Sequence, residues 1–174
     1  MQEKTLKTAR IYDGKVINLR VDTVELPDKK YSKREIVEHA GAAAVVPLTA
    51  TGHVVLVKQF RKPVDEVIYE IPAGILETKE TAENCARREL AEETGYRAGT
   101  LELLTAYYPS PGFSNEVIHV FLARDLSEGT ARPDEDEYLE VVEIPMDQAI
   151  KMIKEGRIKD SKAIIGLLMA QNLT

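Results

Sequence analysis

The stretch EIPAGILETKETAENCARRELAEETGY, residues 70–96, decides the fold because it joins a glycine turn to a helix rich in carboxylates. Thr81 is a good N-cap residue, and Gly95 suits the position just after a helix. The pattern therefore predicts a helix from about residue 82 to residue 94. Three acids crowd the end of this helix, where the partly negative carbonyl groups disfavour negative charge.

These acids are Glu89, Glu92 and Glu93. Residues four apart on a helix lie one above the other, so Glu89 and Glu93 share one stripe of its surface. The same stripe carries the apolar residues Ala82, Ala86 and Leu90. We therefore expect Glu89 and Glu93 to face the protein body, whereas Arg88 and Glu92 fit an ordinary solvated ion pair.

Two partly buried carboxylates repel each other unless a cation lies between them. A hard divalent ion fits such a site, because Mg²⁺ prefers carboxylate oxygens and keeps its remaining positions for water and phosphate. The sequence thus predicts a Mg²⁺ site on this helix, in which Mn²⁺ could substitute.

The composition of the whole chain narrows the class of protein. The 174 residues suffice for one compact domain, and the net charge of −6 argues against a general surface for nucleic acid or anionic membranes. Cys85 is the only cysteine, so an intramolecular disulfide is impossible, and we expect a small core residue. The chain shows no apolar signal segment and no bilayer-spanning stretch, which predicts a cytoplasmic protein.

Apolar patterns along the chain predict many strands, one internal helix, more strands and two final helices. The predicted strands are residues 15–26, 31–39, 42–48, 53–60, 67–71, 101–108, 116–124 and 138–144. The final helices are predicted at 146–156 and 161–172, the second with Ile164, Leu167 and Leu168 at helical spacing. This order favours an α/β fold in which helices cover both faces of a mixed sheet.

The quoted stretch resembles the Nudix box. All seven fixed positions of that pattern are present: Gly74, Glu80, Arg88, Glu89, Glu92, Glu93 and Gly95. Tyr96 takes the last position, where an aliphatic residue is the norm. The resemblance implies a Nudix α/β/α sandwich with a mixed sheet in residues 41–174. It also implies an N-terminal antiparallel β-subdomain in residues 1–40, which would serve dimerisation and the adenine side of the site.

The resemblance also implies roles for residues of the box. Glu89 and Glu93 would be the main metal ligands, with Glu92 as a nearby ligand and the backbone carbonyl of Ala73 in the metal shell. Arg88 would hold neighbouring carboxylates by ion pairing. Glu80 would be structural, near the helix start where negative charge is favourable.

Three further stretches resemble the ADP-ribose pyrophosphatase branch of the family. They are EIPAG, KQFRKP and YYPSPGFSNE, the last of which places Pro111 fifteen residues after Tyr96. By themselves the Pro and Gly of that last stretch would mark only a turn. The substrate-binding residues that the resemblance implies are Arg34, Glu35, Arg61, Ile75, Ser110, Gly112 and Glu116. Tyr31, or an apolar residue near Val16, could stack on adenine.

The acidic stretch RPDEDEYLEVVEIP, residues 132–145, is either a solvated loop or the source of a catalytic base. The resemblance favours Glu137, just before a predicted strand, and Glu135 is the alternative. The predicted catalytic residues are thus Glu137 or Glu135, together with Glu92 and Arg88.

The resemblance implies Mg²⁺-dependent hydrolysis of ADP-ribose to AMP and ribose 5-phosphate by a homodimer, in which Arg34 acts across the interface. The alternative substrate is another nucleotide sugar such as GDP-mannose. An alternative from another class is a sensor that binds ADP-ribose without cutting it, although degenerate box acids would be expected in such a protein.

Overall fold

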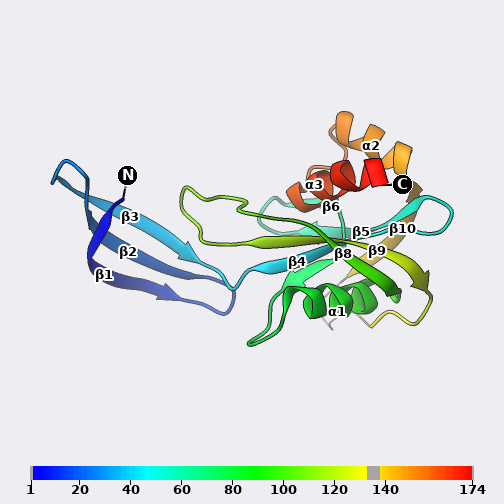
Figure 1. Ribbon diagram of the computed structural model, residues 1–174, viewed down its shortest axis with the longest axis horizontal. Coiled ribbons are helices and arrows are strands. Elements are labelled where there is room, and N and C mark those ends of the chain that lie inside the picture. Colours follow the sequence, from blue (N-terminus) through cyan, green and yellow to red (C-terminus); the bar gives the residue numbers. More distant parts are fainter. Residues whose placement is uncertain (1, 133–137, 174) are drawn as a thin grey trace. The chain divides into compact units, whose positions relative to one another are not determined.

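The structure is a computed structural model that describes residues 2–132 and 138–173 of the chain (Figure 1). The chain divides into two compact units. The first comprises Met1–Gly41 and Tyr108–Val117, and the second comprises Ala42–Tyr107 and Ile118–Thr174. Among the described residues, no helix has both the length and the apolar character needed to cross a membrane.

The first unit is built on an antiparallel sheet. Its strands are β1 (Lys4–Asp13), β2 (Asn18–Glu25) and β3 (Tyr31–Glu38), in the order β1-β2-β3. The segment Tyr108–Val117 is held at the end of β3, where the Val37 amide donates to the carbonyl of Phe113 at 2.8 Å. The Asn115 amide donates in turn to the Val37 carbonyl at 3.2 Å. By its contacts this segment belongs with the N-terminal sheet, although the sequence prediction placed it with residues 41–174.

Two sheets form the frame of the second unit. The first is mixed, with the order β7-β4-β9-β8, because β4 runs parallel to β9 and the other pairs are antiparallel. The second is antiparallel, with the order β10-β5-β6. The strands are β4 (Ala42–Pro47), β5 (His53–Arg61), β6 (Glu66–Glu70), β7 (Ala73–Ile75), β8 (Arg97–Tyr107), β9 (Ile118–Ser127) and β10 (Leu139–Pro145).

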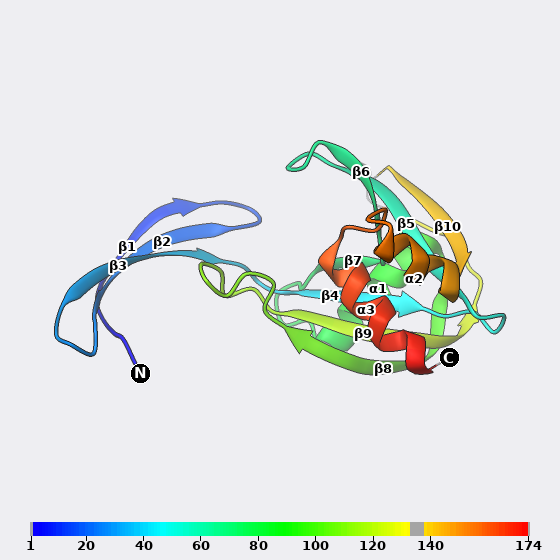
Figure 2. The same ribbon diagram turned by 90° about the horizontal axis from the view of Figure 1, so that it is seen from above.

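Helices cover both faces of the mixed sheet. Helix α1 (Ala82–Thr94) lies on one face, and α2 (Met146–Lys154) and α3 (Ser161–Ala170) lie on the other (Figure 1). A short 3₁₀ turn at Gln171–Leu173 follows α3, which runs across β4 and β9 in Figure 2. The predicted layers are therefore present.

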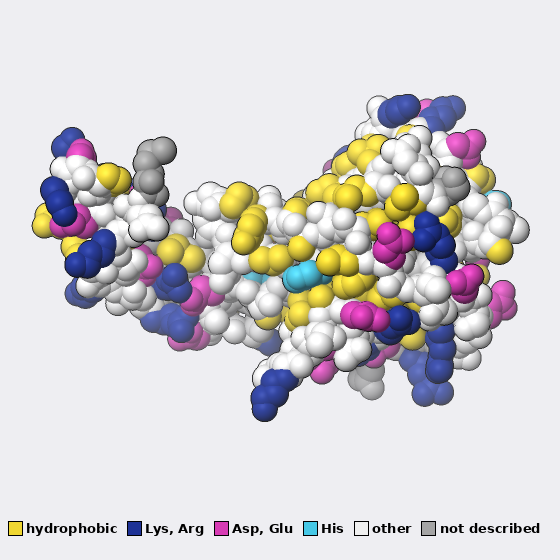
Figure 3. All heavy atoms as spheres, in the orientation of Figure 1, with side chains coloured by type: hydrophobic (Ala, Val, Ile, Leu, Met, Phe, Trp, Pro, Cys, Tyr) yellow, Lys and Arg dark blue, Asp and Glu magenta, His cyan; other side chains and the backbone are white. Residues whose placement is uncertain are grey.

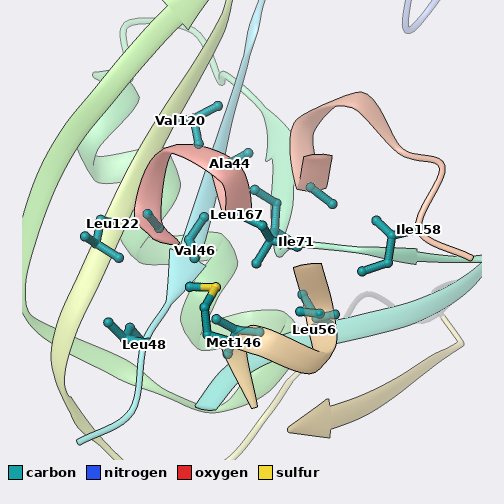
Figure 4. Packing of buried hydrophobic residues seen from close by; sticks show 14 of the residues in the cluster. Ala44, Val46, Leu48, Leu56, Ile71, Val120, Leu122, Met146, Ile158 and Leu167 are labelled. Atoms are coloured by element: carbon teal, nitrogen blue, oxygen red, sulfur yellow. The ribbon is translucent and has the colours of Figure 1, made fainter. Parts of the chain in front are cut away.

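The apolar run of β4 explains how one strand serves two cores. Successive side chains of a strand point to opposite faces, so Ala44 and Val46 pack toward α3 while Ala43 and Val45 pack toward α1. The larger cluster includes Leu56, Ile71 and Leu167, all fully buried (Figure 4). Such two-sided burial produces a continuous apolar run instead of an alternating one.

Helix α1 begins and ends as predicted. The Thr81 side chain accepts a hydrogen bond from the Asn84 amide at 3.3 Å, and Gly95 closes the helix with a φ of 78°. Tyr96 packs against the α1-side core, and its hydroxyl donates to Glu143. The aromatic ring thus fills the position where the family pattern has an aliphatic residue.

Three details of the prediction were wrong or incomplete, and one is that strand β1 precedes the first predicted strand, residues 15–26. In α3, Leu168 is 44% exposed, and the buried face is formed by Ala163, Gly166, Leu167 and Ala170. Small residues are needed there because a Cβ at Gly166 would lie 2.7 Å from Cγ2 of Val46. The three-residue strand β7 was not predicted, since it is too short to show a pattern.

Candidate active site

Two carboxylates of helix α1, four residues apart in the sequence, are buried. Glu89 is 8% exposed and Glu93 is 3% exposed, and they lie one turn apart on the same side of the helix. The prediction that this stripe faces the protein body is confirmed, since Ala86 and Leu90 are fully buried in the adjacent core. Burial of two like charges in so small a volume is costly without compensating cations.

The turn at Gly74 brings backbone against one of these carboxylates. A Cβ atom at position 74 would lie 1.7 Å from Oε1 of Glu89, so only glycine leaves room for the observed carboxylate. Gly74 is held in β7, which pairs with β4 through Ala43 opposite Gly74 and Ala44 opposite Ala73. The short strand thus fixes the Ala73–Gly74 backbone beside Glu89.

Arg88 connects three acids, of which Glu80 precedes helix α1 and the other two lie on it. Its guanidinium makes a two-pronged contact with Glu80, with both N–O distances at 2.9 Å. It also donates to Glu89 at 2.6 Å and to Glu92 at 3.1 Å. The Arg88 hydrogen bond is the main cause that lowers the pKa of Glu80 to about 2. Glu80 is therefore held ionised at neutral pH.

Glu92 differs from its two neighbours in its surroundings. It lines a cavity of about 280 Å³ together with Ala91, Arg97, Thr130 and Arg132, whereas Glu89 and Glu93 do not line it. Across the described part of the chain, no three acidic, histidine or cysteine side chains converge as a complete metal-binding group. Two buried carboxylates and nearby backbone oxygens are what the described residues offer to a cation.

Arg61 comes from β5, and its charge interacts with that of Glu93 at this site. The charge of Glu93 contributes to a raised pKa of Arg61, after the larger effect of its hydrogen bond to Glu70. Arg61 donates from Nε to Oε1 of Glu70 at 2.6 Å and from Nη2 to Oε2 at 3.1 Å. Lys162 of α3 also donates to Glu70, at 3.1 Å.

Sequence reasoning missed Glu70, Lys162 and Asp160, although Glu70 and Lys162 each leave a signal. Glu70 is an acid at the end of an apolar strand, and Lys162 is the one charged residue within the predicted helix SKAIIGLLMAQN, residues 161–172. A buried charge such as Glu70 requires a partner, and Lys162 supplies one from a distant part of the chain.

Behind the carboxylates, Cys85 is fully buried, as expected for a core residue. Its thiol donates weakly to the carbonyls of Gly74 and Ile75, at 3.6 and 3.7 Å. Burial raises the pKa of this thiol to about 12, with a further contribution from Glu80. The Ile75 carbonyl also accepts a hydrogen bond from Arg88 at 3.4 Å, while the Ile75 side chain is 41% exposed.

Several predicted substrate residues lie in the first unit. Arg34 is paired with Glu3 at 2.5 Å, and Glu35 is exposed on the opposite face of β3. Glu116 lies 3.6 Å from Nδ1 of His39. The carbonyl of Ser110 accepts from the Ser114 amide at 2.9 Å, and open space surrounds Gly112. The two candidate bases, Glu135 and Glu137, lie outside the described residues.

Comparison with protein-family models gives two matches. Residues 38–165 match the NUDIX domain, and residues 3–37 match the nucleoside diphosphate sugar hydrolase N-terminal domain. Together the two matches cover nearly the whole chain.

Curated relatives carry three different names. The chain is 49% identical to an ADP-ribose pyrophosphatase of Bacillus subtilis, over 98% of this chain and 94% of that relative. It is 48% identical to a methanol dehydrogenase activator of Bacillus methanolicus, over 98% and 93%. It is 39% identical to a GDP-mannose pyrophosphatase of Yersinia enterocolitica, over 79% and 77%.

Among solved structures, the chain resembles one described as an ADP compounds hydrolase. The TM-score is 0.88, the match covers 99% of this chain and 94% of the other, and the sequence identity is 18%. At this identity the likeness concerns the fold, which it places in the predicted α/β class.

Proposed function

This chain is a member of the Nudix family, and we propose that it hydrolyses the diphosphate bond of ADP-ribose to give AMP and ribose 5-phosphate. Membership confirms the predicted fold and the predicted enzyme class, a Nudix pyrophosphohydrolase. The observation that carries the choice of substrate is the 49% identity, over nearly the full length, to an ADP-ribose pyrophosphatase.

The charges of the described site suit a diphosphate. Two negative charges lie next to the bond to be cut, so water can attack phosphorus only where cations neutralise them. Arg61 supplies one cation beside Glu93, and only its Nε and Nη2 are engaged by Glu70. Its Nη1 makes no hydrogen bond to the described residues, and a guanidinium edge is well shaped for phosphate oxygens.

The acids of the site suit Mg²⁺ or Mn²⁺. Glu89 and Glu93, the carbonyl of Ala73 and a reoriented Glu92 would hold the ion, all through the hard oxygen ligands that it prefers. The fit rests on the close approach of the Gly74 backbone to the buried Glu89 carboxylate. When bound, such an ion lowers the charge of the diphosphate and the pKa of a coordinated water.

The remaining roles belong to the proposal and rest on the family resemblance. A carboxylate at Glu137, or at Glu135, would accept the proton of the attacking water. Arg34, Glu35, Ile75, Ser110, Gly112 and Glu116 would bind the nucleotide and the ribose. A homodimer and a cytoplasmic location complete the proposal, and the single cysteine agrees with a reducing compartment.

A screen that follows the nucleoside monophosphate formed by cleavage of the diphosphate bond tests the substrate. Purified chain with Mg²⁺ is assayed on ADP-ribose, ADP-glucose, GDP-mannose, NADH and 8-oxo-dGTP. We expect the highest kcat/KM for ADP-ribose. A GDP-mannose rate far above that of ADP-ribose would favour the alternative substrate, for which the Yersinia relative is the precedent. Tight binding of ADP-ribose without turnover would favour a sensor.

The relative named a methanol dehydrogenase activator favours a second candidate function, because its identity to this chain is nearly as high. Adding the chain to a methanol dehydrogenase and following the rate of alcohol oxidation tests it. Glu93→Gln separates the two functions, since activation that survives loss of hydrolysis would not depend on the carboxylate site.

A further inference from the structure

We propose that Glu70 is a positioning residue, which orients Arg61 toward the diphosphate and keeps it from closing onto Glu93. The inference rests on the proposed function and adds to it a partly buried charge network, centred on the buried Glu70, that fixes the position of Arg61. The network consists of Arg61, Glu70, Asp160 and Lys162.

The contact between Arg61 and Glu70 is selective. In the β5–β6 hairpin the residue directly opposite Arg61 is Glu66, whereas Glu70 pairs with Val57. The Arg61 side chain nevertheless extends back along the hairpin to Glu70 and makes a two-pronged contact with it. Glu66 is instead paired with Lys159 at 2.7 Å. A planar fork held by two parallel bonds has a defined orientation.

Glu70 is itself held from the opposite side. It is 2% exposed, and its Oε2 accepts from Lys162 as well as from Arg61. Lys162 is held by Asp160 at 2.7 Å, and Asp160 caps α3 by accepting from the Ala163 amide at 2.9 Å. The two positive and two negative charges of the network cancel. Its contacts link the start of α3 to the Arg61 guanidinium.

The same network maintains the charge of Glu70. Burial would raise the pKa of this carboxyl, but the Arg61 hydrogen bond and the charge of Lys162 outweigh burial and hold the pKa below its usual range. The charge of Glu93 also acts on the Arg61 guanidinium, after the larger effects of Glu70, and we infer that the two carboxylates compete for it. Without Glu70, Arg61 would pair with Glu93 and occupy the carboxylate that the metal ion needs.

A double-mutant cycle tests this inference. Glu70→Gln, Arg61→Ala and the double variant are compared for kcat and KM, and for Mn²⁺ affinity by calorimetry without substrate. We expect Glu70→Gln to lower kcat/KM by about tenfold or more and Arg61→Ala by about a hundredfold. The double variant should be no worse than Arg61→Ala, because Glu70 acts through Arg61.

Metal affinity gives a readout that a merely structural role would not produce. Glu70→Gln should weaken Mn²⁺ binding several-fold, because Arg61 is released toward Glu93, and Arg61→Ala in the same chain should restore the binding. Two results would overturn the proposal. One is that the losses of kcat/KM multiply in the double variant, and the other is that its Mn²⁺ affinity stays low.

Glu66→Gln is the matched control, because it breaks the exposed Lys159 pair between the same two segments. Glu66→Gln should leave kcat/KM and Mn²⁺ affinity unchanged. Losses equal to those of Glu70→Gln would also count against the proposal.

If Glu70→Gln fails to fold, Asp160→Asn replaces it, since Asn caps a helix as well as Asp. That variant frees Lys162 to compete for Glu70, so we expect a loss of a few-fold that disappears in the Arg61→Ala background.

The proposed function can fail separately from this inference. A wild-type chain that cleaves none of the five compounds would refute the function. Binding of inorganic pyrophosphate in the presence of Mg²⁺ then decides the role of Glu70. Weaker binding in Glu70→Gln than in the wild type, with the double variant no weaker than Arg61→Ala, supports positioning. Unchanged affinity in Glu70→Gln opposes it.

Discussion

The backbone at Gly74 passes so close to the Glu89 carboxylate that a Cβ would lie 1.7 Å from Oε1 and 2.1 Å from Cδ. Both atoms are at the far end of a flexible side chain, so an added methyl group would displace the carboxylate and spare the backbone. The glycine therefore sets where Glu89 rests, and the fold itself can tolerate a substitution there.

Gly74→Ala should consequently fold with little loss of stability but bind the metal ion poorly. Displacement of one ligand by more than about 1 Å costs on the order of a hundredfold in rate. Calorimetry with Mn²⁺ and kcat/KM on the cleaved substrate measure the effect. Gly52→Asn is the control, because Gly52 has open space around it and a φ of 78° that Asn tolerates.

Glu93→Gln tests the second buried carboxylate. The amide keeps the shape of the side chain but removes its charge, so turnover should fall by several orders of magnitude while the fold survives. Glu83→Gln on the same helix is the control, since Glu83 lies in the exposed first turn and pairs with Arg87. Equal rates for Glu93→Gln and the wild type would refute the metal assignment.

The Arg88–Glu80 pair predicts how stability depends on pH. The Arg88 hydrogen bond lowers the pKa of Glu80 from its ordinary value of 4.5 to about 2. A carboxyl with a lowered pKa stabilises the fold above its unfolded-state value, and this stability is lost as pH falls from about 4.5 toward 2. After screening by solvent we expect about 1–2 kcal/mol.

Urea unfolding of the wild type and of Glu80→Gln between pH 2 and pH 7 measures that contribution. The variant should be less stable at pH 7, and the difference should shrink as the pH drops below 4.5. A difference that stays constant with pH would show that packing, and not charge, accounts for the role of Glu80.

Local signals were sufficient to predict much of this fold. Helix α1 was predicted to the residue because Thr81 and Gly95 act through contacts within the helix itself. The two buried acids were predicted because helical spacing alone places Glu89 and Glu93 on the apolar stripe. Both inferences depend on residues fewer than fifteen positions apart in sequence.

Contacts between distant segments were not predictable in this way. The Glu70–Lys162 pair joins residues 92 positions apart, and the segment Tyr108–Val117 meets β3 across a similar gap. Neither contact has a periodic pattern, because each depends on how β6, α3 and the loop are brought together by the rest of the fold. Arg61 was identified from the family resemblance, but the residue that holds it was not.

The environment of Cys85 predicts that the enzyme is insensitive to thiol reagents. Burial raises the pKa of the thiol from 9.0 to about 12, so at pH 8 only about one thiol in ten thousand is the reactive thiolate. The sulfur is also fully covered, with weak contacts to the carbonyls of Gly74 and Ile75. We therefore expect a disulfide reagent at pH 8 to react with Cys85 only after unfolding, so that one equivalent reacts only in urea.

Ser127, which is exposed at the end of β9, offers the control: Cys85→Ala combined with Ser127→Cys should react at once. Native chain that reacts as fast as this control would mean that the turn behind Glu89 opens readily. Such opening would be incompatible with a site whose carboxylate is held in place by the backbone at Gly74.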